Sequence, residues 1–285
     1  MKLDMQKIYI DSRFKTANSK SESDFTVELP RSFNVPDGVV AHIDDIVIPV
    51  SWRTVDDRNN MCYVEFTLLI PDVGLSTRSR NFTIDSRNYD GDTFKIALAA
   101  KLNTAVYGFV GPGADNPVFV CGYDGRENHF TISLTDPRGV AAKTVQPFTF
   151  KIFTDAELIA ANTDNTPHTI NTIIRNTAPT IITEAAPYTC FLDLFNTRNL
   201  YLTSSALCSY DTVSNFGMDT IVKKIPCTAP YNKMIFQSSG STLDGLDVSK
   251  RTLRYMDFKL VDSHFRPVDL QGNHFSFSIV FAQKR

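Results

Sequence analysis

Residues 275–281, with the sequence FSFSIVF, alternate apolar and polar side chains over most of their length. Similar alternation occurs in 25–29 (FTVEL), 130–134 (FTISL) and 256–260 (MDFKL), with turn-forming Gly, Pro, Asn and Asp between the segments. Successive side chains of a strand point to opposite faces, so each segment can bury one face and expose the other. Many short segments of this kind predict an all-β protein built as an antiparallel β-sandwich.

The composition also favours strands over helices. Of the 31 acidic residues, 25 are Asp and only 6 are Glu. Glu is common on helix surfaces, whereas Asp is common in turns and at helix N-termini. The chain also contains 21 Phe and 28 Thr, which fit a pleated sheet. A mainly helical protein is therefore excluded.

Only a few short helices are expected. Asp92 can cap a helix with an apolar face. That face consists of Phe94, Leu98 and Leu102. Thr154 and Glu157 have the spacing of a capping box, and Pro167 can open a third helix.

No linker or internal repeat divides the sequence clearly. Residues 1–22 are mostly polar apart from an apolar run at 8–10, and we expect them to form an N-terminal arm that docks on another surface. Residues 23–285 are expected to form one domain. The strand pattern loosens between about 163 and 249, which predicts a loop-rich insertion there.

Several classes of protein are unexpected for this sequence. No apolar run approaches the roughly 18–20 residues that span a bilayer, and the N-terminus lacks the apolar stretch of a secretory signal. The five cysteines are odd in number and contain no C-x-x-C pair. This argues against a disulfide framework or a zinc site, and indicates reduced thiols in a protein made in the cytosol.

No catalytic, cofactor or metal site is predicted. Residues 262–264 (DSH) have triad residue types, but neighbours on a strand face opposite ways, so a turn is the better interpretation. Residues 108–113 (GFVGPG) lack the Lys-Ser/Thr ending of a phosphate loop, and 90–92 (DGD) lacks the remaining calcium ligands. Five scattered histidines show no ligand spacing. The sequence therefore predicts a protein that is not an enzyme.

The charge is distributed unevenly along the chain. Residues 1–20 carry five basic residues against two acidic ones, and residues 250–285 carry seven against three. The net charge of the whole chain is −2, so the middle is strongly acidic. Either the terminal basic residues only promote solubility, or both ends lie on a surface that faces a polyanion.

Short motifs follow one another in a recognisable order. They are YIDSR (9–13), SDFTVEL (23–29), HIDDIVIP (42–49), YDGD (89–92), AKLN (100–103), NHFTI (128–132), FKLVD (258–262), VDLQG (268–272) and the strand at 275–281. This order and the chain length resemble the penton (minor capsid) proteins of polinton-like viruses, adintoviruses and virophages, which are small double-stranded-DNA viruses. The resemblance is densest in the first 60 and last 35 residues.

The resemblance implies a single jelly roll and a structural role in the virion. Five copies would form the homopentameric vertex capsomer of an icosahedral capsid, among double-jelly-roll major capsid proteins that are about twice as long. In that setting, an arm could clamp a neighbouring subunit through Ile8, Tyr9, Ile10 and Arg13. Basic residues at the two ends could face packaged DNA, namely Lys2, Lys7, Lys15, Lys284 and Arg285.

Two other functions are consistent with a β-sandwich. One is a receptor- or carbohydrate-binding module, such as a spike or lectin, that binds through loops in 163–249. Possible stacking surfaces there are Tyr188, Tyr201, Tyr210 and Tyr231. The other is a β-sandwich hydrolase, which the missing catalytic constellation disfavours.

Overall fold

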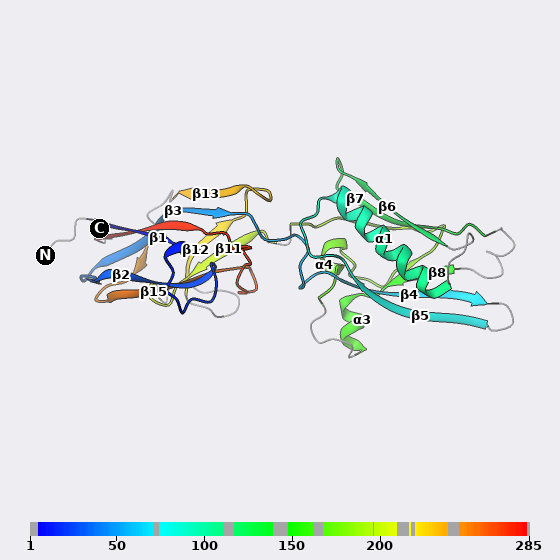
Figure 1. Cartoon of the computed structure of the whole chain (residues 1–285), viewed down its shortest axis with the longest axis horizontal. Helices are drawn as coiled ribbons and strands as arrows, with labels where there is room; N and C mark the ends of the chain where they lie inside the picture. The colour runs from blue at the N-terminus through cyan, green and yellow to red at the C-terminus, as the bar shows by residue number, and fades with distance from the viewer. Residues whose placement is uncertain are drawn as a thin grey trace. The chain divides into compact units, whose positions relative to one another are not determined.

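The structure is a computed structural model. It describes residues 5–70, 74–110, 117–138, 148–161, 168–195, 197–209, 217, 220–238 and 245–283. The chain divides into two compact units (Figure 1). Unit 1 combines Met1–Trp52 with Thr197–Arg285, and unit 2 is Arg53–Asn196. Each unit has its own hydrophobic core.

Unit 1 contains two antiparallel sheets. The first has the order β1 (Gln6–Asp11), β16 (Ser276–Gln283), β3 (Val39–Pro49) and β13 (Met234–Ser238). A short strand, β14 (Leu246–Asp247), also pairs with β3. We call this the first sheet.

The second sheet of unit 1 has four strands. Their order is β12 (Ile221–Pro226), β11 (Asn199–Thr203), β15 (Thr252–Val261) and β2 (Asp24–Asn34). The register of β15 against β2 shifts between Leu253 and Tyr255, and that of β11 against β12 shifts after Leu202. These irregularities interrupt the period-two pattern of the strands.

The strand pairs of unit 1 are nested along the chain. The first strand, β1, pairs with the last, β16; β2 pairs with β15, β3 with β13, and β11 with β12. Eight strands paired in this way across two packed sheets form a jelly roll. The predicted fold class, an antiparallel β-sandwich with a jelly roll, is confirmed.

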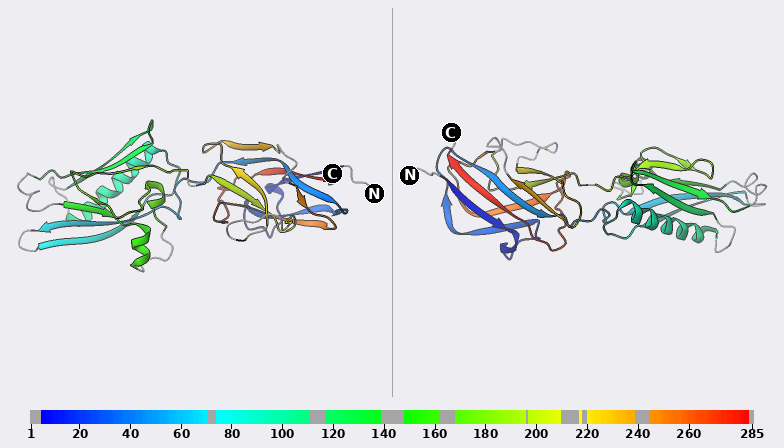
Figure 2. Two further views of the ribbon diagram at one scale, coloured as in Figure 1. Left: turned by 180° about the vertical axis from the view of Figure 1, so that it is seen from behind. Right: turned by 90° about the horizontal axis from the view of Figure 1, so that it is seen from above.

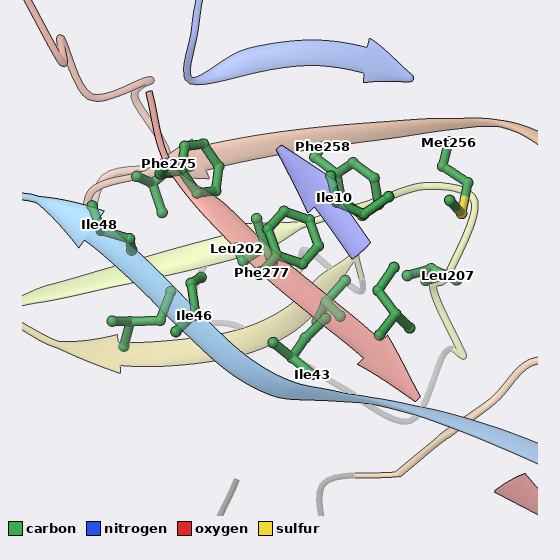
Figure 3. Close-up of a cluster of buried hydrophobic side chains, with 14 of the residues drawn as sticks. Ile10, Ile43, Ile46, Ile48, Leu202, Leu207, Met256, Phe258, Phe275 and Phe277 are labelled. Atoms are coloured by element: carbon green, nitrogen blue, oxygen red, sulfur yellow. The ribbon is translucent and has the colours of Figure 1, made fainter. Parts of the chain in front are cut away.

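Aromatic side chains from both sheets meet in the core of unit 1 (Figure 3). The rings of Phe258 on β15 and Phe277 on β16 lie 4.8 Å apart between centroids, with an interplanar angle of 78°. Phe25 on β2 meets Phe275 edge to face at 5.6 Å. Edge-to-face pairs of this kind stabilise a core beyond their area burial. The alternation at 275–281 therefore marks core-facing positions.

Strand β1 contains the residues that the sequence assigned to an N-terminal arm. Ile8 pairs with Ile279 and Ile10 with Phe277 on β16. Ile10 is only 4% exposed and belongs to the core of unit 1, and Ile8 packs against that core. Residues 6–11 are thus the first strand of the jelly roll in their own chain. An apolar run of three residues is too short to display strand alternation, which explains the arm prediction.

Unit 2 packs two smaller antiparallel sheets and a helix around a second core (Figure 2). One sheet has the order β5 (Gly74–Thr83), β4 (Met61–Ile70), β8 (Phe148–Ile152) and β9 (Ile181–Ile182). The other has the order β10 (Tyr188–Phe191), β7 (His129–Thr135) and β6 (Val118–Asp124). Strands β6 and β7 form a hairpin, in which Asp124 pairs with His129 next to the turn.

The long helix α1 (Gly91–Val110) packs against β6 and β5. Its buried face is the predicted one, formed by Phe94, Leu98 and Leu102. The cap is Asp90 rather than Asp92, because Asp90 Oδ1 accepts from the backbone N–H of Thr93 at 2.8 Å.

Two short helices and one 3-10 turn complete the described elements. Helix α3 (Asp155–Ala160) begins with the predicted capping box of Thr154 and Glu157, which is confirmed. Helix α4 (Asn171–Ile174) is four residues long, and Pro167 lies outside the described residues. The 3-10 turn η1 (Ser12–Phe14) directly follows β1.

The observed insertion differs from the expected one at 163–249. Unit 2, Arg53–Asn196, lies in the chain between β3 and β11 of the jelly roll. Residues 199–238 supply the jelly-roll strands β11, β12 and β13, which the sequence assigned to loops. The register shift in β11 and β12 breaks their alternation, whereas the strands of unit 2 alternate as regularly as those of the jelly roll. Periodicity alone therefore could not separate the two units.

Candidate assembly surface

The ends of the described chain lie together at one end of the jelly roll. Gln6 at the start of β1 pairs with Phe281, and Gln283 at the end of β16 pairs with Val39. Strand β3 runs from Val39 to Pro49, about 33 Å away at the usual rise per residue. The chain enters unit 2 shortly after that far end. The jelly roll thus has one end near the termini and another from which the chain continues to unit 2.

The predicted arm residues do not share one environment. Ile8 and Ile10 face the core, whereas Tyr9 is 76% exposed on the outer face of the first sheet. Arg13 forms an ion pair with Asp11, with 2.6 Å between Arg13 Nη2 and Asp11 Oδ2. This hydrogen bond lowers the pKa of the Asp11 carboxyl and raises that of Arg13. Of the four residues, Tyr9 and Arg13 are available for contact with another molecule.

The predicted DNA-facing residues divide into two groups. Lys7 Nζ lies 2.7 Å from Asp44 Oδ2, and Lys15 Nζ lies 2.8 Å from Glu22 Oε1. These pairs raise the pKa of Lys7 and lower that of Glu22, mainly through the side-chain hydrogen bonds. Their positive charges are therefore compensated locally. The remaining predicted residues, Lys2, Lys284 and Arg285, lie outside the described residues.

The outer face of the first sheet carries exposed apolar side chains that sequence reasoning missed. A groove of about 380 Å³ is lined by the side chains of Tyr9, Phe14 and Val47, together with Ile10, Phe277 and three polar residues. Phe236 of β13 pairs with Val47, and Met234 lies two residues further along β13. We call the five residues Tyr9, Phe14, Val47, Met234 and Phe236 the apolar face. The feature of the sequence that indicates this face is the apolar run at 234–236, which lies in β13 at the edge of the first sheet.

Four of the five side chains of the apolar face are more than half exposed to solvent. Phe14 and Tyr9 are 77% and 76% exposed, Phe236 is 67% and Met234 is 54%. Tyr9, Phe14 and Val47 line one groove, and Phe236 lies beside Val47 on the next strand. The polar residues Asp45 and Ser276 also line this groove and lie among the apolar side chains.

A second groove lies on unit 2, between α3 and the outer face of β4 and β5. Its volume is about 440 Å³, and its apolar lining includes Tyr63, Phe153 and Leu158. Glu157 at its rim pairs with Lys151, with 2.6 Å between the charged atoms. The groove combines aromatic surface with polar side chains, as small-ligand sites do.

The triad-like motif at 262–264 is a turn, as predicted. Asp262 Oδ1 accepts from the backbone N–H groups of His264 and Arg266, and Asp262 Oδ2 accepts from Arg266 Nε. Both carboxylate oxygens of Asp262 therefore accept hydrogen bonds that stabilise the turn. Among the described residues, no group of three or more His, Cys, Asp or Glu could hold a metal ion. No described helix is both long enough and apolar enough to cross a membrane.

The described tyrosines among those considered for carbohydrate stacking lie in different environments. Tyr188 is buried and its hydroxyl donates to the Ile174 carbonyl. Tyr201 stacks on Phe265 at 6.0 Å, and Tyr231 is 45% exposed. Tyr210 lies outside the described residues.

The cysteines do not form disulfides in the structure. Cys62, Cys121 and Cys208 are buried, and the other two are partly buried. Burial raises the pKa of Cys121 to about 12 and that of Cys227 to about 11. Such thiols are poor nucleophiles near neutral pH.

Comparison with known proteins gives a likeness of fold. No family model and no curated relative matches the sequence. A crystal structure of the mavirus penton protein, in its SeMet-labeled form, matches 97% of this chain and 99% of its own, with a TM-score of 0.53 and 10% sequence identity. The fold is therefore similar to that of the mavirus penton protein. Since the match covers nearly all of both chains, it includes the unit inserted in the jelly roll as well as the jelly roll itself.

Proposed function

We propose that the protein is a penton, the structural capsid protein that forms the five-fold vertex of an icosahedral double-stranded-DNA virus. The observation that carries this proposal is the end-to-end likeness to the mavirus penton protein across both units. The protein would act in the virion after synthesis in the host cytosol. Its function would be assembly rather than catalysis.

The polarity of the jelly roll fits a vertex position. The chain ends leave from one end of the sandwich, and the connection to unit 2 leaves from the other. We infer that the termini face the capsid interior. Double-jelly-roll major capsid proteins would surround the pentamer.

Contact with packaged DNA is proposed only for the outermost basic residues. Lys7 and Lys15 are paired with carboxylates, so reversing their charge would also break ion pairs within the jelly roll. Replacing Lys2, Lys284 and Arg285 by Glu avoids those pairs. If the termini bind DNA, particles with this triple variant retain less genome than wild-type particles. Equal DNA content would contradict this part of the proposal.

The mass and symmetry of the purified protein test the main proposal. Five copies of a 31.9 kDa chain have a mass of roughly 160 kDa. Light scattering over a concentration series measures that mass, and electron-microscopy class averages show the symmetry. Five-fold rings support a penton. A monomer or trimer at the highest concentration, without five-fold density in particles, contradicts it.

The groove of unit 2 favours a second candidate, a receptor- or carbohydrate-binding module. Tyr63 and Phe153 supply ring faces, and Ser79, Asn81 and Glu157 supply polar groups suited to sugar hydroxyls. Glycan-array binding that is lost in Tyr63→Ala and kept in Tyr231→Ala would support this candidate. If the protein binds no glycan on the array, this second candidate function is ruled out.

A further inference from the structure

The apolar face has the size of the apolar part of a protein interface. Three aromatic side chains and one Met, each more than half exposed, present on the order of 500 Å² of apolar surface. A standard interface buries about 800 Å² per partner, of which roughly 60% is apolar. A small ligand in the 380 Å³ groove would leave Phe236 and Met234 uncovered, since neither lines that groove.

The charges around the apolar face include no excess of positive charge that would bind DNA. Three carboxylates lie on this side of the first sheet, from Asp11, Asp44 and Asp45, against the two cations Lys7 and Arg13. The bulge at the centre of β3, where Asp44 has no partner on β16, turns two consecutive carboxylates toward one side. These charges pair with one another and leave one carboxylate in excess, so the surface does not attract a polyanion. A protein with a basic rim would be attracted.

The outer face of the second sheet has such a rim. Four cations lie there among three carboxylates; the cations are Lys20, Lys224, Arg254 and Lys259, and the carboxylates are Asp24, Glu28 and Asp257. Tyr255, 56% exposed, lies among them and donates to Glu28 Oε1 at 3.0 Å. Arg254 donates to the same oxygen at 2.8 Å. The ring of Tyr255 is thereby held in a fixed position, as an interface anchor requires. We call this surface the basic face.

We propose that the apolar face of one copy binds the basic face of the next copy of this chain. The two faces belong to opposite sheets of one sandwich, so they point away from each other. A chain with two different complementary faces forms head-to-tail contacts, and these close into a ring when each contact adds a fixed rotation. This inference rests on the proposed penton function and names the surfaces that build the ring. The alternative contact, apolar face against apolar face, would bring two sets of three carboxylates together.

Substitution of the aromatic anchors tests the interface. Tyr9 and Phe236 are outward-facing, so the double variant Tyr9→Ser with Phe236→Ser keeps the core intact. Removing two buried aromatic anchors from an interface should raise the dissociation constant of the ring by roughly a hundredfold or more. The matched control is Phe191→Ser, because Phe191 is 63% exposed on β10 of unit 2. We expect the double variant to be monomeric at concentrations where the wild-type protein and the control form rings.

Crosslinking of an isotope-mixed sample identifies the two faces directly. Equal amounts of ¹⁴N- and ¹⁵N-labelled protein are treated with a carbodiimide, which joins carboxylates to lysines in contact. Crosslinks between copies should join Asp44 or Asp45 to Lys224 or Lys259. Mixed-isotope crosslinks that instead lie within unit 2, or that spare both faces, overturn the inference.

The outcomes separate this inference from the penton proposal. Five-fold rings in both the wild type and the double variant overturn the apolar face as the contact, while the penton proposal stands. Rings that form normally but fail to enter particles would show that the apolar face meets the major capsid protein instead. A wild-type protein without rings or vertex density removes both proposals.

Discussion

Replacing Ile10 by Ala tests whether β1 is a structural strand of the jelly roll. Ile10 is 4% exposed and pairs with Phe277, whose ring lies in the centre of the core. The substitution removes three carbon atoms, worth about 2.4 kcal/mol in transfer free energy, and leaves part of the space empty. We expect a loss of about 3 kcal/mol in the free energy of unfolding of unit 1.

Calorimetry of the full chain measures this effect. For a unit of this size, about 3 kcal/mol lowers the midpoint of thermal unfolding by roughly 9 °C. The protein concentration must be held constant, because ring formation would raise the midpoint. The matched control is Ile96→Ala, since Ile96 is 66% exposed on α1 and changes by the same atoms.

The position of the affected transition carries further information. If the two units unfold separately, Ile10→Ala lowers the transition of unit 1 and leaves that of unit 2 in place. The control shifts either transition by less than about 2 °C. An Ile10→Ala midpoint equal to that of Ile96→Ala would refute the assignment of β1 to the core and restore the interpretation of residues 1–22 as a detached arm.

Three further predictions follow from single contacts. A Cβ at Gly91 would lie 2.1 Å from Cε1 of Tyr123, so Gly91→Ala should lower the free energy of unfolding by about 1–3 kcal/mol. The control Gly125→Ala, whose Cβ would lie 3.6 Å from the same atom, should lower it by less. Chemical-denaturation midpoints that are unchanged in both variants would contradict this prediction. The Lys15 hydrogen bond lowers the folded-state pKa of Glu22, so this group contributes stability above its unfolded pKa and loses it as the pH falls through its folded pKa. Lys15→Ala should therefore reduce the acid-dependent part of a pH titration of stability, and an unaltered pH profile would count against the pair. Cys62 and Cys121 of unit 2 are buried, and burial raises the pKa of both thiols. Thiol labelling of these two cysteines at pH 8 should therefore be slow in the folded protein and fast after unfolding. Rapid labelling of the folded protein would show that the two thiols are accessible.

The sequence predicts the fold class well because regular strands record which face is buried. The alternation at 275–281 and 130–134 corresponds to strands whose inward residues are buried. Local capping chemistry is equally readable, as the capping box of Thr154 and Glu157 shows. Both signals depend on residues close together in the chain. They therefore do not require knowledge of the tertiary structure.

Features set by long-range pairing were harder to predict. Ile10 lies in the core because β16, more than 260 residues later, pairs with β1, and nothing in 1–22 records that partner. The apolar face joins Tyr9 and Phe236 across four strands for the same reason. Lys7 and Asp44 compensate each other only after β1 and β3 have both joined β16. The terminal charge totals therefore overstated the positive charge available to a polyanion.

The nested pairing explains how the jelly roll accommodates unit 2. The inserted segment lies between β3 and β11, so the nested pairs β1–β16, β2–β15 and β3–β13 all enclose it, and the pair β11–β12 follows it. The entropic cost of closing a long connection grows only with the logarithm of its length, so an insertion of this kind is tolerated. Its folding order is nevertheless constrained. Unit 2 is continuous in sequence and can form its contacts as soon as it is synthesised, whereas β3 must wait for β13, and β1 must wait for β16. The apolar face, which needs β1, β3, β13 and β16 together, is therefore complete only after β16 has been synthesised.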